Sequence, residues 1–344
     1  MFIRNAWYIA TWADEIRDIP FARRILGEAI VLFRDSAGKI GALEDRCCHR
    51  GYPLALGEVV GGSIQCGYHG LEFDITGRCV RIPGQPNVPP GFRVRSYPVA
   101  EQDAMIWIWM GDPARADAAT IPGFPYNNDW PSRKMTSHAR FNYRRIVENL
   151  MDLSHFAFLH KSTVGGSVDA HVNAKMSVTE TARGVKFMRW LLDAPPPPLY
   201  LKALPFKGNV DRWLEMEFVA PSACLQYTGG IDAGTGAYDQ GRRDGGFALR
   251  MLHGVTPETE HSCFYFFSLC TGFRHDDPSM VERIFTETQT TIREDVVALE
   301  AQDARLRETG EARLHAIRSD AARLQADKAF DRLHKEEAAM QAGA

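Results

Sequence analysis

The feature that most constrains this chain is a pair of short Cys/His loops near its N-terminus. Residues 47–51 read Cys-Cys-His-Arg-Gly, residues 66–70 read Cys-Gly-Tyr-His-Gly, and sixteen residues separate His49 from Cys66. Each loop offers a thiol and an imidazole and ends in glycine. Thiolates and imidazoles at such spacings are typical metal ligands. The chain must therefore fold so that the two loops meet.

Two kinds of metal centre fit these four donors. Zinc accepts two thiolates and two imidazoles in a tetrahedral site, but zinc fingers usually order their ligands as a Cys pair followed by a His pair. Here each loop supplies one of each, which suits a two-iron cluster. Cys47 and Cys66 would hold one iron, and His49 and His69 the other. The pattern favours the iron–sulfur cluster over structural zinc.

The pattern Cys-x-His-x16-Cys-x2-His resembles the Rieske [2Fe-2S] motif of the Rieske non-heme iron oxygenases. Neutral histidine ligands raise the reduction potential of such a cluster, which makes it an electron relay. Cys48 departs from the family, in which proline is commoner at this position, and its role stays open.

A second group of polar residues follows in the middle of the chain. Asn149, Asp152 and His155 recur every three residues among apolar neighbours, which predicts one inward face of a helix from about Asn142 to Leu159. His155 and His160 lie ~140° apart around an ideal helix, so both reach one metal only if the turn between them is irregular. Two histidines and one carboxylate form the facial triad that binds Fe(II) and leaves positions open for oxygen.

The third ligand is expected on a long helix that begins after Pro278 and ends near Glu308. Steps of three and four residues place Asp295 on the buried face of this helix, and Asp303 lies on the same stripe two turns later. The spacing of His155 and His160 resembles the mononuclear iron site of the same oxygenases. In that family the third ligand stands in a similar Glu-Asp context, so the resemblance implies Asp295, with Asp303 as the alternative.

Asp152 has two possible roles. From the residues alone, it supports His155 through the free imidazole N–H. The family resemblance implies that an acid at this position links the iron ligand His155 to the cluster ligand His69 of the partner subunit. Such a link requires a head-to-tail homotrimer. Asn149 resembles an amide found near the iron in this group.

The distribution of strands and helices predicts an α+β fold. Short strands and turns fill the first third, and Ala104–Met110 predicts a strand buried on both faces. A proline-rich stretch after Gly111 marks a domain boundary. We expect an all-β Rieske [2Fe-2S] domain over residues 1–112 and a helix-grip catalytic domain, an antiparallel sheet with a long helix, over residues 113–344. Strands of the second domain are predicted at 185–192, 213–219, 224–228, 247–252 and 263–269.

Three other segments have distinctive compositions. Pro195–Pro198 predicts a stiff loop. Gly229–Gly246 carries seven glycines, which predicts either a disordered surface loop or an active-site lid. A second amphipathic helix, with Leu314, Ile317, Leu324 and Leu333, is expected to close the chain.

Composition excludes several classes of protein. A chain of 344 residues with 45% hydrophobic and 24% charged residues is globular, and a net charge of −3 leaves no basic surplus for nucleic acid or an anionic membrane. The N-terminus lacks a secretory signal and no apolar run could span a bilayer, so we expect a cytoplasmic protein. The cysteine count is odd, which suits metal ligation plus free thiols better than disulfides. The expected free thiols are Cys48, Cys79, Cys224, Cys263 and Cys270.

Further stretches resemble one branch of the family, the vanillate O-demethylase and dicamba monooxygenase type. They are Asn5–Tyr8, Gly67–Phe73, Ile106–Trp109, Asn149–Asp152 and Thr256–Thr259. The resemblance implies a monooxygenase that uses O2 to demethylate an aryl methyl ether, a methoxybenzoate such as vanillate, to a phenol and formaldehyde. N-demethylation, or hydroxylation of another aromatic or alicyclic substrate, is the alternative.

The same resemblance implies a source of electrons and a substrate site. Electrons would come from NADH through a separate flavin and iron–sulfur reductase, which fits the lack of a Gly-x-Gly-x-x-Gly fingerprint in this sequence. Gln226 and His253 resemble positions that contact the substrate carboxylate in the dicamba enzyme; alternatively, both are polar residues on a sheet surface. An electron carrier without oxygen chemistry would need only the Cys/His loops, and Asp152, His155 and His160 argue against it.

Overall fold

The computed structural model describes residues 2–310 and 314–342. The chain divides into two compact units. Unit 1 comprises Met1–Gly123 with Thr256–Glu260, and unit 2 comprises Phe124–Val255 with His261–Ala344. No helix in the described ranges is both long and apolar enough to cross a lipid bilayer.

Unit 1 is built from small antiparallel sheets. Three are present in its described residues: β1 (Trp7–Trp12), β10 (Met105–Trp109) and β9 (Val99–Gln102); β2 (Phe21–Ile25), β3 (Glu28–Arg34) and β4 (Ile40–Glu44); and β5 (Glu58–Val60), β6 (Ser63–Gln65), β7 (Glu72–Phe73) and β8 (Cys79–Arg81). Every residue of the central strand β10 is buried, which confirms the strand predicted from its apolar run. The first Cys/His loop follows β4, and the second connects β6 to β7.

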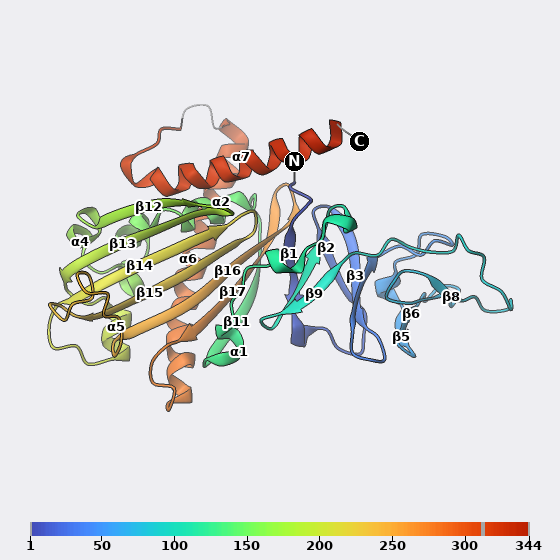
Figure 1. The fold of residues 1–344 in the computed structure, drawn as a ribbon, viewed down its shortest axis with the longest axis horizontal. Coiled ribbons are helices and arrows are strands. Elements are labelled where there is room, and N and C mark those ends of the chain that lie inside the picture. The colour runs from blue at the N-terminus through green and yellow to red at the C-terminus, as the bar shows by residue number, and fades with distance from the viewer. Residues whose placement is uncertain (1, 311–313, 343–344) are drawn as a thin grey trace. The chain divides into compact units, whose positions relative to one another are not determined.

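Unit 2 is organised around one antiparallel sheet (Figure 1). Its described strands are, in spatial order, β11 (Ser132–Ala139), β17 (Ser262–Thr271), β16 (Phe247–Thr259), β15 (Ala223–Asp232), β14 (Val210–Val219), β13 (Gly184–Ala194) and β12 (Lys175–Thr181). β12 to β17 are neighbours in chain order, and β11 pairs with β17 at the far edge. The predicted α+β architecture is confirmed, although the sequence pattern missed β11 and β12.

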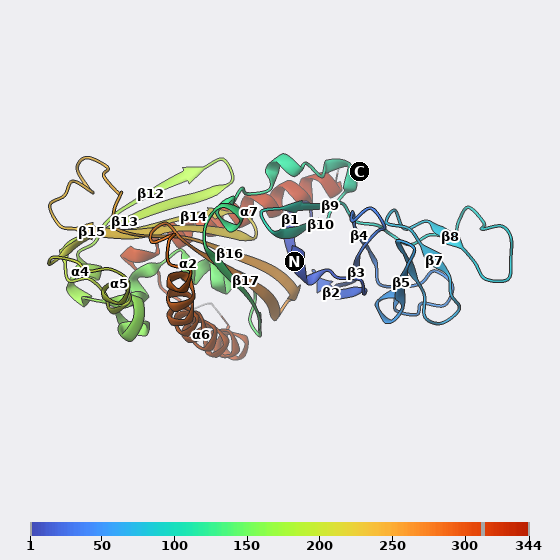
Figure 2. The same ribbon diagram turned by 90° about the horizontal axis from the view of Figure 1, so that it is seen from below.

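The long helix α6 (Pro278–Thr309) lies across one face of this sheet, as Figures 1 and 2 show. The Asp277 carboxylate accepts a hydrogen bond from the Ser279 backbone N–H at its start. Proline at the first helical position and an acidic N-cap are strong start signals. The helix predicted after Pro278 is therefore confirmed.

The helix predicted over 142–159 is wrong as a continuous element. α2 (Arg144–Leu150) ends before Asp152, a short 3₁₀ turn covers Leu153–His155, and α3 covers Phe156–Leu159. Asp152 is extended, with φ −136° and ψ 95°, and its carboxylate accepts a hydrogen bond from the Ser154 backbone N–H. This local bond caps the 3₁₀ turn and competes with helix continuation.

Two loop predictions also need correction. Gly229 and Gly230 belong to β15, where a Cβ on Gly229 would lie 2.2 Å from the Trp213 ring. The loop therefore begins only after Asp232, and glycine serves here for close packing. Pro198 is the first residue of α5 (Pro198–Ala203) and not part of a loop.

The C-terminal helix α7 (Ala321–Ala342) starts later than expected. Leu314 and Ile317 precede it and are exposed. The helix is anchored by Phe330, which is fully buried with its ring centroid 5.2 Å from that of Phe218 on β14.

We expect Phe330→Ala to destabilise unit 2 by about 3–5 kcal/mol, because truncating a buried aromatic ring leaves a cavity between α7 and the sheet. Urea unfolding followed by tryptophan fluorescence measures the change. Leu324→Ala on the same helix, where the side chain is 40% exposed, is the matched control and should stay within about 0.5 kcal/mol of wild type. Equal losses in the two variants would contradict this anchoring role.

Candidate metal centres

The two Cys/His loops of unit 1 share one backbone design. In the first loop the Gly51 N–H donates to the Cys47 carbonyl at 2.9 Å, and in the second the Gly70 N–H donates to the Cys66 carbonyl at 2.9 Å. In both, the cysteine N–H donates to the carbonyl five residues further on. Both glycines adopt φ +72°, a left-handed conformation that side chains rarely tolerate. This geometry explains why glycine ends each loop.

The loops place their thiols inside and their imidazoles outside. Cys47 and Cys66 are buried and in hydrogen-bond contact, and burial raises the pKa of the Cys47 thiol to about 11. His49 and His69 are exposed, with ring centroids 4.5 Å apart. Two paired thiols and two paired imidazoles are the donor set of a two-iron cluster with one iron at each pair. Cys48 is exposed and does not join the buried thiol pair.

All seven cysteines are free, and the expected non-ligand thiols other than Cys48 are buried. This agrees with the expectation that the chain has no disulfide framework.

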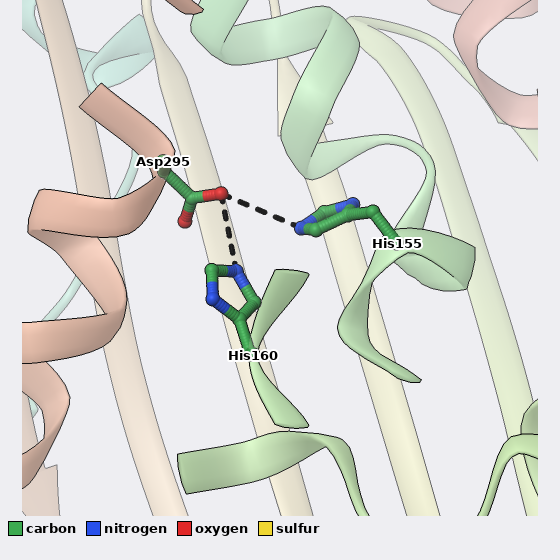
Figure 3. Close-up of side chains that lie close together, drawn as sticks. All are labelled: His155, His160 and Asp295. Atoms are coloured by element: carbon green, nitrogen blue, oxygen red, sulfur yellow. Dashed lines mark hydrogen bonds and ion pairs between the residues drawn. The ribbon is translucent and has the colours of Figure 1, made fainter. Parts of the chain in front are cut away.

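In unit 2, His155, His160 and Asp295 come together (Figure 3). One ligand atom from each lies within 4.8 Å of the others. Asp295 Oδ1 is 3.1 Å from His160 Nε2 and 3.5 Å from His155 Nε2. α3 ends at Leu159, and His160 has φ −108° and ψ 36°. The predicted irregular turn between the two histidines is therefore confirmed.

Each imidazole of this group has an oxygen at its other nitrogen. His155 Nδ1 lies 2.6 Å from the Asp152 backbone carbonyl, and His160 Nδ1 lies 2.7 Å from Glu294 Oε2. In a neutral imidazole these contacts place the hydrogen on Nδ1 and leave the Nε2 lone pair directed at Asp295. Among the described residues His155 Nε2 has no hydrogen-bond partner of normal geometry. Two lone pairs and a carboxylate converge, as a bound cation requires.

Electrostatics in this group depend on the buried carboxylate. Burial opposes the charge of Asp295, but the imidazoles of His155 and His160 beside it hold its pKa well below the usual range. Asn149 Nδ2 also donates to Asp295 Oδ1, at 3.0 Å. Burial likewise opposes protonation of His160, yet its bonds with Asp295 and Glu294 raise its pKa. The carboxylate is ionised, the Asn149 amide donates to it, and the Nε2 atoms of both histidines face it.

Asp303, the alternative third ligand, lies elsewhere on α6. Its Oδ1 is 3.5 Å from Arg145 Nε and its Oδ2 is 3.4 Å from Arg307 Nε. Two guanidinium groups therefore balance its buried charge, and it needs no metal for that purpose. This geometry supports Asp295 as the third ligand.

Asp152 supports His155 through its backbone carbonyl and not through its carboxylate. The carboxylate accepts hydrogen bonds from Ser154 and Ser319 and lies 3.9 Å from Arg189. The inward face predicted for Asn149, Asp152 and His155 is not helical, because the chain is extended at Asp152. The link to His69 of the partner subunit stays a prediction.

A pocket lies between strands β14–β17 and helices α2, α3, α5 and α6, and Asp295 forms part of its wall. Gln226 and His253 line it and are buried. His253 Nε2 is 2.9 Å from Gln226 Oε1, and Nδ1 is 2.6 Å from the Tyr265 hydroxyl. Burial lowers the pKa of His253 to about 3, so this imidazole is neutral at physiological pH.

The structure adds one charged residue that the sequence pattern did not single out. Arg212 also lines the pocket. β14 begins at Val210, earlier than the predicted 213, and strand alternation then places Arg212 on the same side as Leu214 and Met216. A longer predicted strand would have identified it.

The glycine-rich segment packs away from this pocket. Ala237 is buried against Trp213, and the Tyr238 ring centroid lies 5.4 Å from that of Trp190. Trp213 neighbours Arg212 along β14, so the two side chains point to opposite faces of the sheet. The segment therefore covers the face opposite the pocket, and its packing gives no support to the lid hypothesis.

Known proteins resemble the chain over nearly its whole length. The Rieske [2Fe-2S] domain family matches residues 6–98, and the vanillate O-demethylase oxygenase C-terminal domain family matches residues 139–336. The first match decides between the two metals in favour of the [2Fe-2S] cluster.

Two relatives and one solved structure illustrate this similarity. The iron–sulfur subunit of the toluene-4-sulfonate monooxygenase system of Comamonas testosteroni is 36% identical, with 98% of each chain covered. The oxygenase component of dicamba O-demethylase of Stenotrophomonas maltophilia is 36% identical, with 98% of this chain and 98% of that one covered. The crystal structure of dicamba monooxygenase bound to dicamba superposes with a TM-score of 0.89 at 34% identity, covering 98% of this chain and 99% of that chain.

We expect Asp295→Ala to abolish binding of the mononuclear iron, because the substitution removes the carboxylate from this group and leaves only the two imidazoles. Asp303→Ala should keep that iron. Metal analysis, with the visible absorbance of the cluster as an internal reference, measures both variants. Loss of mononuclear iron in Asp303→Ala with retention in Asp295→Ala would reverse the assignment.

Proposed function

The chain belongs to the Rieske non-heme iron oxygenases, and we propose that within this family it demethylates an aryl methyl ether, a methoxybenzoate such as vanillate, to a phenol and formaldehyde. The observation that carries the proposal is the convergence of His155, His160 and Asp295 at the wall of a largely apolar pocket. The similarity to the oxygenase component of dicamba O-demethylase supports an O-demethylation.

Two metal groups would be held by this chain. Cys47, His49, Cys66 and His69 would hold the cluster, and His155, His160 and Asp295 would hold a mononuclear ferrous ion. When bound, the ferrous ion supplies activation of O2 and oxidation of the methyl carbon, with electrons from NADH delivered through a separate flavin and iron–sulfur reductase. The resulting hemiacetal collapses in water to a phenol and formaldehyde.

The residues around the iron ligands set the conditions for this chemistry. Glu294 and the Asp152 carbonyl hold the imidazoles of His160 and His155 so that both Nε2 atoms face inward. The Asn149 amide steadies the Asp295 carboxylate. Apolar side chains such as Met251 and Phe267 line the pocket and exclude water from the methyl group.

The polar pair in the pocket is proposed to orient the substrate. His253 Nε2–H donates to the Gln226 carbonyl oxygen, since Nδ1 accepts from the Tyr265 hydroxyl, whose pKa burial raises well above its usual value. The Gln226 NH2 group is then the donor that the pair can offer to a polar substituent of the ring.

A second reaction has its own support. The similarity to the subunit of a toluene-4-sulfonate monooxygenase system equals that to the dicamba enzyme. O-demethylation and hydroxylation of a ring methyl group both insert oxygen into a C–H bond of a methyl group, and they differ in whether an oxygen joins that methyl group to the ring. Hydroxylation of a ring methyl group is therefore the alternative, alongside N-demethylation.

We further propose a head-to-tail homotrimer in which Asp152 connects His155 to His69 of the partner subunit. His69 is exposed, and the Asp152 side chain retains 20% exposure, so both can face a second chain. Electrons would then pass from the cluster of one subunit to the iron of the next.

We expect the metal-loaded protein, supplied with NADH and a surrogate reductase, to release formaldehyde from vanillate. Formaldehyde and NADH oxidation, measured together, should agree one to one, because each demethylation uses two electrons. His160→Ala should keep the visible spectrum of the cluster and release none. Hydroxymethyl product from 4-toluenesulfonate, with no formaldehyde from any methoxybenzoate, would establish the alternative reaction.

Asp152→Asn should lower turnover by about a hundredfold while both metals stay bound, because the change removes the charge that supports the link between histidines. Stopped-flow oxidation of the reduced cluster in the presence of substrate and O2 measures the step. Asp169→Asn, on the surface helix α4 (Val168–Val172), is the control. Wild-type rates of cluster oxidation in Asp152→Asn would rule out the bridging role.

A further inference from the structure

The pocket of unit 2 contains a buried guanidinium that forms no ion pair with any described residue. Arg212 lines the pocket and is only 4% exposed. No Asp or Glu oxygen of the described residues forms an ion pair with it. Its polar contact is a bond from Nη1 to the Gly165 carbonyl at 3.3 Å, and its guanidinium lies 5.1 Å from the centre of the Tyr200 ring. Within the described residues its Nε has no hydrogen-bond partner.

The surroundings of Arg212 do not neutralise it. The Gly165 carbonyl is shared with His171 Nε2, which binds it at 2.7 Å. Burial, and then the nearby charge of Arg212, lower the pKa of His171 to about 3, so this imidazole is neutral. Arg189 is a second buried guanidinium, and it already faces Asp152. Burial of a charge without a partner is unfavourable because the charge loses its hydration, so an anion bound at this point would offset that loss.

Strand register separates Arg212 from the neutral polar pair. Arg212 is opposite Gly230 on β15, whereas His253 is opposite Cys224 on the same strand. Six residues along a strand span about 20 Å, and the four residues from Gly230 to Gln226 span about 13 Å. The pocket therefore has a cationic end at Arg212 and an uncharged hydrogen-bonding end at Gln226 and His253.

The wall between these ends fits an aromatic ring. Among the described residues that line the pocket, Arg212 is the only cation and Asp295 the only anion. Leu249 on β16 and its partner Thr228 on β15 lie between the two ends, and Phe247 lies opposite Gly230 at the Arg212 end. A ring held against this apolar wall can present an acidic substituent to the guanidinium.

We propose that Arg212 binds the anionic group, a carboxylate or a sulfonate, of the aromatic substrate. The guanidinium offers Nε and the Nη groups in a planar fork that matches two oxygens of such an anion. The Gln226 amide, held by His253, then contacts a neutral polar substituent at the other end of the pocket, in place of the carboxylate that the family resemblance assigns to this pair. This inference rests on the proposed function, which supplies the aromatic substrate, and it adds that this substrate carries a negative charge.

Binding to the metal-loaded protein tests the proposal without turnover. Calorimetry with vanillate and with vanillamide, its uncharged and nearly isosteric carboxamide, compares the two forms of one substituent. Wild type should bind vanillate about ten- to a hundredfold more tightly than vanillamide, the range expected for a hydrogen bond to a charged group. 4-Toluenesulfonate, compared with 4-toluenesulfonamide, provides a second anion with the same expected preference.

Arg212→Gln should remove the preference for the anions and leave the affinity for the carboxamide within a few-fold of wild type. Arg212→Lys keeps the charge without the fork and should retain part of the preference. Arg243→Gln is the matched control, because Arg243 pairs with Glu215 and packs over Trp213 on the opposite face of the sheet. This control should preserve the full preference.

Several outcomes would overturn the inference. Equal affinity of the wild-type protein for the acid and the amide would overturn it, even if Arg212→Gln failed to fold. The absence of detectable binding of either anion would overturn it as well. If Arg212→Gln lowered the affinity for charged and uncharged ligands equally, Arg212 would have only a structural role, through its hydrogen bond to the Gly165 carbonyl. Formaldehyde release without a preference for anions would support the proposed function and contradict the anion site. A preference that depends on Arg212, without formaldehyde release, would support the anion site and contradict the proposed function.

Discussion

Asp295 directs one buried carboxylate oxygen at three nitrogen atoms, those of Asn149, His155 and His160. Much of unit 2 is arranged to make this contact possible. α6 must cross the sheet so that Asp295 faces the pocket, and the chain between α2 and α3 must break so that both imidazoles turn toward it. Because a buried carboxylate and two lone pairs repel without a cation between them, this local arrangement is most stable when the metal is bound.

Which residues come together in the two candidate centres was predictable from the sequence, because residue type and spacing reflect the chemistry that is expected of ligands. Cys47 and Cys66 lie in two loops with the same backbone design. The glycine at the end of each loop indicates the left-handed backbone conformation that both loops adopt. Asp295 was separable from Asp303 by resemblance alone, since both lie on the buried stripe of α6. Only the tertiary structure shows that Arg145 and Arg307 already balance Asp303.

The break at Asp152 could not be predicted from periodicity. Residues spaced by three look helical whether or not the backbone between them is helical, and the deciding contact is a local cap from the Asp152 side chain to Ser154. Arg212 was missed for a related reason. A charged residue at the start of an apolar run is usually assigned to the preceding turn, and only the pairing of Arg212 with Gly230 shows that it lies within the sheet.

The distribution of charge in the pocket bears on how the enzyme would separate its two candidate reactions. Vanillate and toluene-4-sulfonate are both anions, so a guanidinium at Arg212 would hold either one and could not tell them apart. Discrimination must then come from the uncharged end. There the Gln226 amide can donate to an oxygen on the ring, and burial keeps His253 neutral so that no second cation competes for the acid group. A hydroxyl or methoxy oxygen satisfies that amide, whereas a bare methyl group would leave it unpaired in an apolar pocket, and this difference favours the methoxybenzoate.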